Sequence, residues 1–118
     1  MRLTAHEDAE LTDEQVRELA GRLDEAHRDL VGRIDVLSAE LAEGERCQIL
    51  DVADAARERE SKDRTTQLRV RAKAQLTEVE AARQRLLQGT YGLCEASEEP
   101  IGFKRLRVIP WARRAVGE

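Results

Sequence analysis

Asp51 and Asp54 are the residues whose type and spacing are best suited to chemistry, and they lie near the middle of this 118-residue chain. Two carboxylates three residues apart could hold a catalytic metal ion, or could form the ordinary N-terminal cap of a helix. Asp51 would cap through the backbone N–H of Ala53 or Asp54, and Asp54 would lie in the first turn, where the helix dipole favours an anion. From the residues alone, capping is the preferred interpretation. Because the sequence contains no catalytic triad, phosphate loop or nucleophile arrangement, we predict that the protein is not an enzyme.

The sequence on either side of the aspartates has the periodicity of two long helices. Before them, apolar residues recur at steps of three and four, which indicates a helix with one buried stripe: Val16, Leu19, Leu23, Ala26, Leu30, Ile34, Leu37 and Leu41. After them, a second stripe consists of Leu68, Ala72, Leu76, Val79, Ala82 and Leu86. The segment 57–67 is almost wholly polar, so we expect the two arms to be held weakly there.

The two helical arms, 12–48 and 54–88, have matching lengths of about 50–55 Å each. This match favours a hairpin over a single long helix, with its tip near 48–56. Thr12 and Gln15 fit a capping box at the start of the hairpin, and Gly89 suits its end. Residues 1–11 are expected to fray. The predicted fold class is therefore mainly α, a long antiparallel coiled-coil hairpin over 12–88.

Residues 89–118 have a different character, because Pro100, Gly102 and Pro110 exclude a long helix. Thirty residues are too few for an independent core, so we expect this region to pack on the base of the hairpin. The apolar residues available for that packing are Ile101, Phe103, Leu106, Val108, Ile109 and Trp111.

The charges are divided unevenly along the chain. Residues 1–60 hold 17 acidic and 8 basic side chains, and residues 61–118 hold 7 acidic and 12 basic ones. An acidic arm lying against a more basic one favours antiparallel pairing. The net charge of −4 argues against direct nucleic-acid binding as the main activity. The sequence also lacks a membrane span and a signal peptide, which predicts a soluble, cytoplasmic protein without membrane contact.

The two cysteines are not expected to form a disulfide within the chain. In the predicted hairpin, Cys47 lies near the tip and Cys94 near the base, several tens of ångströms apart at ~1.5 Å per helical residue. A disulfide requires their Cα atoms to lie within about 7 Å of each other.

Two separated motifs stand out in the sequence. The first is Tyr91-Gly92-Leu93-Cys94-Glu95-Ala96-Ser97, followed by Pro100-Ile101-Gly102-Phe103-Lys104-Arg105-Leu106 and Pro110. The second is Asp51-x-x-Asp54-x-Ala56. Together they resemble the DksA/TraR family of bacterial RNA polymerase-binding regulators, which has a D-x-x-D-x-A pattern at its coiled-coil tip. The resemblance covers about 48–118 by motif and the preceding helix by architecture, and it implies a zinc-finger-like base.

The chain departs from the family at the positions that would bind zinc. A structural zinc site needs four ligands, and the family places them in two C-x-x-C pairs. Here the first pair is Cys94 and Ser97, and the second pair falls on Ala115 and Glu118. We therefore predict a degenerate finger without bound zinc. Its fold would depend on packing among Tyr91, Leu93, Ile101, Phe103, Leu106 and Trp111.

The resemblance implies a transcription regulator that binds bacterial RNA polymerase through its secondary channel. The acidic tip, with Asp51, Asp54 and Ala56, would approach the polymerase active site. Lys104, Arg105 and Arg107 would dock on the acidic rim of the channel, with a solvated surface as the equal alternative. A monomer is expected. A role for the nucleotide alarmone ppGpp and the sign of regulation stay open.

Three alternatives stand beside this interpretation. The protein could be a competitor that occupies the channel without regulating transcription, or a coiled-coil adaptor whose tip has no function. It could also be a Gre-like cleavage factor that holds a metal ion with both tip aspartates. The substitution Asp54→Asn separates these functions, because only a tip-dependent regulator would lose activity while still binding polymerase.

Overall fold

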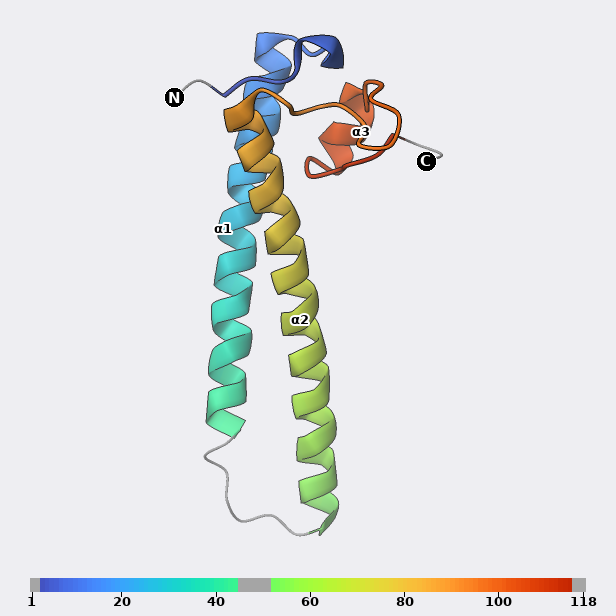
Figure 1. Cartoon of the computed structure of the whole chain (residues 1–118). Helices are drawn as coiled ribbons and strands as arrows, with labels where there is room; N and C mark the ends of the chain where they lie inside the picture. Colours follow the sequence, from blue (N-terminus) through green and yellow to red (C-terminus); the bar gives the residue numbers. More distant parts are fainter. Residues whose placement is uncertain (1–2, 45–51, 116–118) are drawn as a thin grey trace. The chain divides into compact units, whose positions relative to one another are not determined.

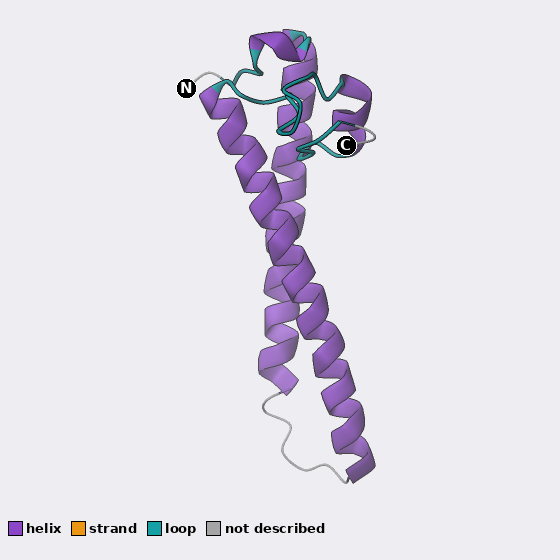
Figure 2. Cartoon of the chain, turned by 45° about the vertical axis from the view of Figure 1, so that its right-hand side comes forward, coloured by secondary structure: helices purple, strands orange, loops and turns teal. Residues whose placement is uncertain are grey.

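The chain folds mainly into helices, and the computed structural model describes residues 3–44 and 52–115 (Figures 1 and 2). A 3-10 helix, η1 (Glu7–Ala9), precedes α1 (Asp13–Gly44), α2 (Val52–Gln88) and the short α3 (Phe103–Val108). The long helices α1 and α2 contact each other as the two arms of a hairpin, which confirms the predicted fold class. Of the predicted tip, only residues 52–56 are described, so Cys47 and Asp51 lie outside the described residues. Within the described ranges, no helix is long and apolar enough to cross a membrane.

The predicted capping box forms at the start of α1. The backbone N–H of Gln15 donates to Thr12 Oγ1 at 3.2 Å, and the backbone N–H of Thr12 donates to Gln15 Oε1 at 3.0 Å. These two bonds satisfy N–H groups that the first helical turn cannot pair internally. The capping box therefore fixes where the outgoing arm begins.

Residues 3–11 pack against the base of the hairpin, and the expectation that residues 1–11 fray stays a prediction. The N–H of Thr4 donates to the carbonyl of Leu86 at 2.9 Å, and the N–H of His6 donates to the carbonyl of Tyr91 at 2.8 Å. Ala9 is buried. The carbonyl of Leu86 belongs to the last turn of α2, where helix geometry leaves acceptors without a partner. The N-terminal segment supplies a partner for one of these acceptors, the carbonyl of Leu86.

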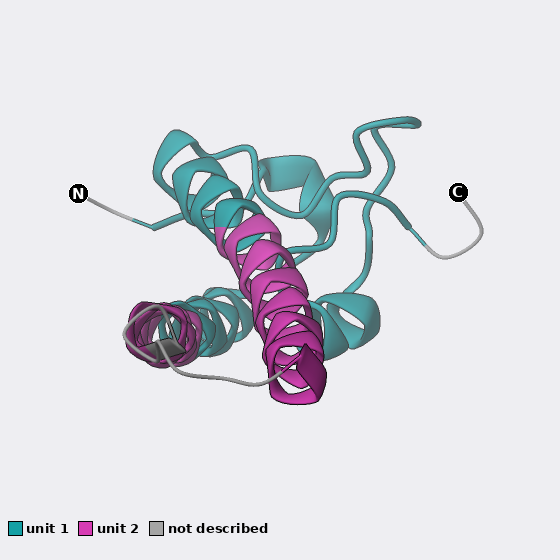
Figure 3. Cartoon of the chain, turned by 90° about the horizontal axis from the view of Figure 1, so that it is seen from below, with its two compact units in different colours: residues 1–27, 77–118 teal, residues 28–76 magenta. Residues whose placement is uncertain are grey.

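The chain divides into two compact units, shown in Figure 3. The first unit comprises residues 1–27 and 77–118 and holds most of the core. Its fully buried large side chains are Leu19, Leu23, Val79, Leu86, Tyr91, Cys94 and Leu106. Polar contacts join the two helices beside this core: Arg83 Nε lies 3.4 Å from Asp24 Oδ1, and His27 Nε2 lies 3.6 Å from Glu80 Oε1. The ion pair of Asp24 with Arg83 has the charge order expected for an acidic first arm and a more basic second arm.

The second unit comprises residues 28–76, and its described part has little buried apolar surface. Its buried side chains are those of Leu30, Leu37 and Ala72. The sequence-based assignment of Leu68 to the buried stripe is wrong, because its side chain is 52% exposed. The inward position three residues before Ala72 is taken by Arg69, which is half-buried. Before Ala72, the inward-facing positions of α2 are therefore taken by polar side chains such as that of Arg69.

Residues 89–115, called the finger-like region below, follow α2 directly. Gly89 adopts a φ of +75°, and the N–H of Thr90 donates to the carbonyl of Arg85 at 2.9 Å, which confirms Gly89 as the helix terminator. An isolated bridge pairs Leu93 with Pro100. Of the apolar residues expected to pack here, Ile101 and Leu106 are buried and Phe103, Ile109 and Trp111 are half-buried. Val108 is 77% exposed, so its predicted place in the cluster is wrong, because it lies on the outer face of α3.

Candidate functional site

The start of α2 presents small and acidic side chains. Asp54 lies in the first turn of the helix and is exposed, and Ala56 is also exposed. Val52 is 86% exposed. The partial positive charge at a helix N-terminus stabilises an aspartate in the first turn. This end of α2 therefore offers an anionic, sterically small surface, while Asp51 lies outside the described residues.

The residues at the family zinc positions do not form a zinc-binding set. The Cys94 thiol is buried, Ser97 is exposed, and the methyl group of Ala115 offers no donor atom. A structural zinc ion takes four sulfur or nitrogen ligands in tetrahedral geometry, and this set supplies one sulfur. Across residues 3–44 and 52–115, no three His, Cys, Asp or Glu residues are grouped in a way that could hold a metal ion. Glu118, the fourth position, lies outside the described residues.

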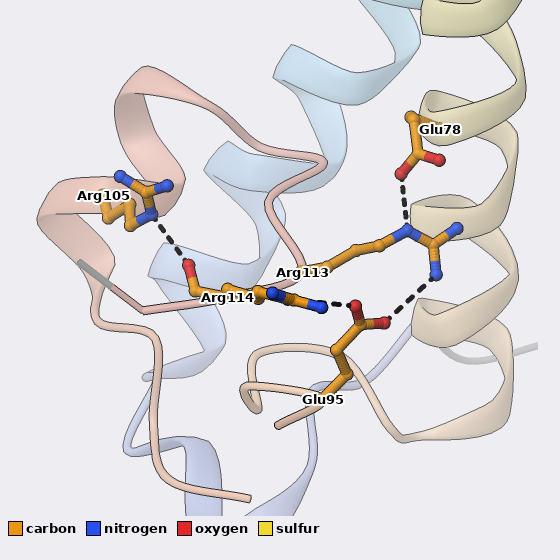
Figure 4. A network of polar contacts seen from close by, with 5 residues as sticks. All are labelled: Glu78, Glu95, Arg105, Arg113 and Arg114. Carbon is orange, nitrogen blue, oxygen red and sulfur yellow. Dashed lines mark hydrogen bonds and ion pairs between the residues drawn. The ribbon is translucent and has the colours of Figure 1, made fainter. Parts of the chain in front are cut away.

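The three basic residues of α3 have different surroundings. Lys104 and Arg107 are exposed. Arg105 is half-buried, and its Nε donates to the backbone carbonyl of Arg114 at 2.8 Å (Figure 4). Val108 adds an exposed apolar side chain beside Arg107. Lys104 and Arg107 are therefore surface cations, whereas Arg105 forms a hydrogen bond within the finger-like region.

A network of ion pairs joins the finger-like region to α2, and we call its four members Glu78, Glu95, Arg113 and Arg114 the ion-pair bridge (Figure 4). Arg113 Nε donates to Glu78 Oε2 on α2, and Arg113 Nη1 lies 3.6 Å from Glu95 Oε2. Arg114 Nε lies 3.4 Å from Glu95 Oε1. The carboxylate of Glu95 thus forms ion pairs with the guanidinium groups of both Arg113 and Arg114.

Three groups in or near this bridge have shifted pKa values. Burial raises the pKa of the Tyr91 phenol above its usual value, and the charge of Arg85 offsets this only in part. Burial and, after it, the charge of Arg113 lower the pKa of Arg85. The hydrogen bond to Glu78 is the main cause that raises the pKa of Arg113. Ion pairing thus favours the charged form of Arg113, while burial keeps Tyr91 neutral.

Sequence reasoning missed the ion-pair bridge. Glu95 directly follows Cys94, and Arg113 and Arg114 directly precede Ala115. Opposite charges therefore stand next to the two segments that zinc ligands would otherwise occupy, and this signal was available in the sequence. The partner on the helix, Glu78, carried no such signal, because it is one of many charged residues on α2.

Comparison with known proteins gives a family match in the finger-like region. The model of the prokaryotic dksA/traR C4-type zinc finger matches residues 89–116. General stress protein 16O of Bacillus subtilis is 44% identical over 41 residues, which is 35% of this chain and 25% of that protein. The RNA polymerase-binding transcription factor DksA of Caulobacter vibrioides is 37% identical over 68 residues, which is 56% of this chain and 46% of that protein. The matched segments thus span less than half the length of these curated relatives.

The similarity in three dimensions extends over nearly the whole chain. The structure of transcription factor DksA2 from Pseudomonas aeruginosa superposes with a TM-score of 0.82 at 31% sequence identity. The superposition covers 92% of this chain and 82% of DksA2. These relatives are named as transcription factors or a stress protein, and none is named as an enzyme. With this coverage and identity, the chain belongs to the DksA/TraR family.

Proposed function

We propose that the protein binds bacterial RNA polymerase and regulates transcription from within the secondary channel. The observation that carries the proposal is the exposed start of α2, with Asp54 and Ala56, on a fold that superposes on DksA2 over 92% of the chain. A long two-helix arm can enter a narrow opening, and a carboxylate at its end can perturb a site rich in cations and basic groups. Biasing the mobile elements there would shift the stability of promoter complexes.

The docking surface of the finger-like region is proposed as Lys104, Arg107 and Val108. These residues are exposed on α3, whereas Arg105 is engaged with the carbonyl of Arg114. Exposed cations beside an apolar side chain suit an acidic protein surface, because the charges steer association and the apolar contact slows dissociation. We therefore propose Lys104 and Arg107, rather than Arg105, as the docking cations.

The function of the tip is tested by separating binding from activity. Asp54→Asn should leave the affinity for polymerase core enzyme within about threefold of wild type, because a single exposed charge adds little binding energy. The same variant should lose the effect on promoter-complex lifetime. Asp63→Asn is the matched control, since it removes one exposed carboxylate from the same helix. Wild-type protein that fails to bind polymerase would exclude the proposal and favour the adaptor.

The same experiment distinguishes a regulator from a channel competitor and from a cleavage factor. Binding without any change in promoter-complex lifetime would identify a channel competitor. Transcript cleavage that depends on both Asp51 and Asp54 would identify a Gre-like factor instead. Adding ppGpp to each reaction tests whether the alarmone acts together with the protein.

The docking surface is tested by charge reversal. The double variant Lys104→Glu/Arg107→Glu should weaken polymerase binding about tenfold or more, and salt should affect its binding less than that of wild type. Arg71→Glu is the control, because Arg71 is exposed on α2 away from α3 in sequence. Equal affinities for both variants would remove α3 from the docking surface.

A further inference from the structure

The chain carries a zinc-finger-like region whose donor atoms do not suit zinc, yet its two ligand-bearing segments lie together. Cys94 and Ser97 lie in the first segment, and Ala115 follows the second. The backbone N–H of Glu95 donates to the carbonyl of Arg113 at 2.9 Å, which places the two segments side by side. In a C4 finger, a metal ion would supply this link, so another interaction must supply it here.

The Glu95 carboxylate is placed to provide that link. It faces Arg113 with one oxygen and Arg114 with the other, at 3.6 Å and 3.4 Å. Figure 4 shows both guanidinium groups converging on this one side chain. A carboxylate shared by two arginines joins two segments at more than one point, as a metal ion does. The two negative charges of Glu78 and Glu95 balance the two positive charges of Arg113 and Arg114.

The link extends beyond the two segments to the rest of the unit. Arg113 also donates to Glu78 on α2, and Arg105 on α3 donates to the carbonyl of Arg114 at 2.8 Å. The second segment is therefore attached to α2, to α3 and to the turn after Cys94. Beneath it, the core includes Cys94 itself, whose side chain is 1% exposed.

We propose that the ion-pair bridge takes the structural place of zinc, so that the finger-like region folds without a metal ion and depends on Glu95 and Arg113. The proposal concerns the protein alone and does not rest on polymerase binding. Partly exposed ion pairs are weakened by salt, whereas a metal–thiolate site is removed by chelators. The two kinds of link therefore respond to different reagents.

The first test compares salt and chelator on the purified full chain. Trp111 is the only tryptophan and lies in the finger-like region, so its fluorescence reports local unfolding. We expect a chelator to leave its thermal transition unchanged, added Zn²⁺ to have no effect, and high salt to lower the transition temperature. One zinc ion per chain, with unfolding of the region after chelation, would overturn the proposal.

The second test measures hydrogen exchange at the Glu95 amide. Glu95→Gln and Arg113→Met should each accelerate its exchange, by about tenfold when combined, because together they remove all three partly exposed ion pairs of the bridge. The double variant should show less than the product of the two single effects, because both substitutions remove the same contact. Glu99→Gln is the control, since it neutralises an exposed carboxylate in the same turn. Equal exchange in Glu95→Gln and Glu99→Gln would refute the proposal.

A third variant covers the case in which these substitutions unfold the region altogether. Cys94→Ala removes the only thiol at the family zinc positions. Under the proposal, the response of the region to chelator and to salt stays as in wild type. The proposal would be overturned if this variant lost the fold of the region and added Zn²⁺ raised the transition temperature of the wild type. Those two results together would show that a metal is required.

Discussion

The hydroxyl of Tyr91 donates a hydrogen bond of 2.6 Å to the backbone carbonyl of Pro110, and the whole tyrosine side chain is buried. This bond joins the first residues of the finger-like region to the segment after α3. It also satisfies a phenol that would otherwise be buried without a partner. Tyr91 thus connects both ends of the region through its core.

Tyr91→Phe should destabilise the protein by about 1–2 kcal/mol, because it removes the hydrogen bond and leaves the carbonyl of Pro110 unsatisfied. Thermal unfolding followed by Trp111 fluorescence measures the change. An unchanged transition would mean that water replaces the hydroxyl at no cost.

The raised pKa of Tyr91 gives a pH dependence with a defined sign. A phenol whose folded pKa is raised stabilises the fold fully below the pKa of an unfolded tyrosine, about 10. Above that pH the unfolded state loses its proton first, so the free energy of unfolding falls as pH rises. Wild type should lose stability more steeply than Tyr91→Phe above pH ~10. Parallel pH profiles for the two proteins would contradict the assignment.

Gly92→Ala should be strongly destabilising, because two separate effects add. A Cβ at this position would lie 2.6 Å from Ala9 Cβ, and the backbone has a φ of +100°. Together, the overlap and the backbone strain should cost about 3 kcal/mol or more in unfolding free energy. Gly102→Ala is the control, since its φ is +98° but nothing lies within 4 Å of the added atom. That variant should lose only about 1–2 kcal/mol.

Gly21→Ala and Gly32→Ala should each stabilise the hairpin. Both glycines lie inside α1, and a Cβ at either position would meet nothing within 4 Å. Replacing glycine by alanine in an exposed helix interior gains about 1 kcal/mol. Chemical denaturation followed by circular dichroism measures the gain. A loss of stability in either variant would contradict the open helix surface assigned to that glycine.

Arg69→Leu should also stabilise the hairpin, by about 1 kcal/mol, because Arg69 occupies an inward position of α2. Its Nε is shielded from solvent and has no hydrogen-bond partner among the described residues. Leucine would replace this unpaired group with apolar contact. Arg71→Leu is the comparison, because Arg71 is exposed and its replacement should change stability by less than about 0.5 kcal/mol. Similar effects of both substitutions would argue against a buried position for Arg69.

The helices could be predicted from the sequence because periodicity and caps act locally. The capping box at Thr12 and the terminator Gly89 depend on residues within one helical turn. Leu68 was assigned wrongly for a related reason. Residues 68 and 69 both satisfy a spacing of three or four from Ala72, and only the packing of the partner helix selects between them.

Contacts between distant segments could not be predicted in the same way. The N-terminal segment was expected to fray because nothing near Thr4 or His6 shows that Leu86 and Tyr91 will accept their N–H groups. The ion-pair bridge depends on Glu78, a residue 35 positions from Arg113. Of the three predicted functional residues at the tip, Asp54 and Ala56 are described and exposed, and their role stays a prediction until binding is measured.

The packing of residues 3–11 on the finger-like region sets the order in which the protein can form during synthesis. His6 is synthesised before both long helices, whereas Tyr91, whose carbonyl accepts its N–H, is synthesised after them. Contacts of such large sequence separation form late in folding, because the whole intervening loop must close first. Both helices of the hairpin are therefore synthesised before residues 89–115. Only then can residues 3–11 form their contacts with that region.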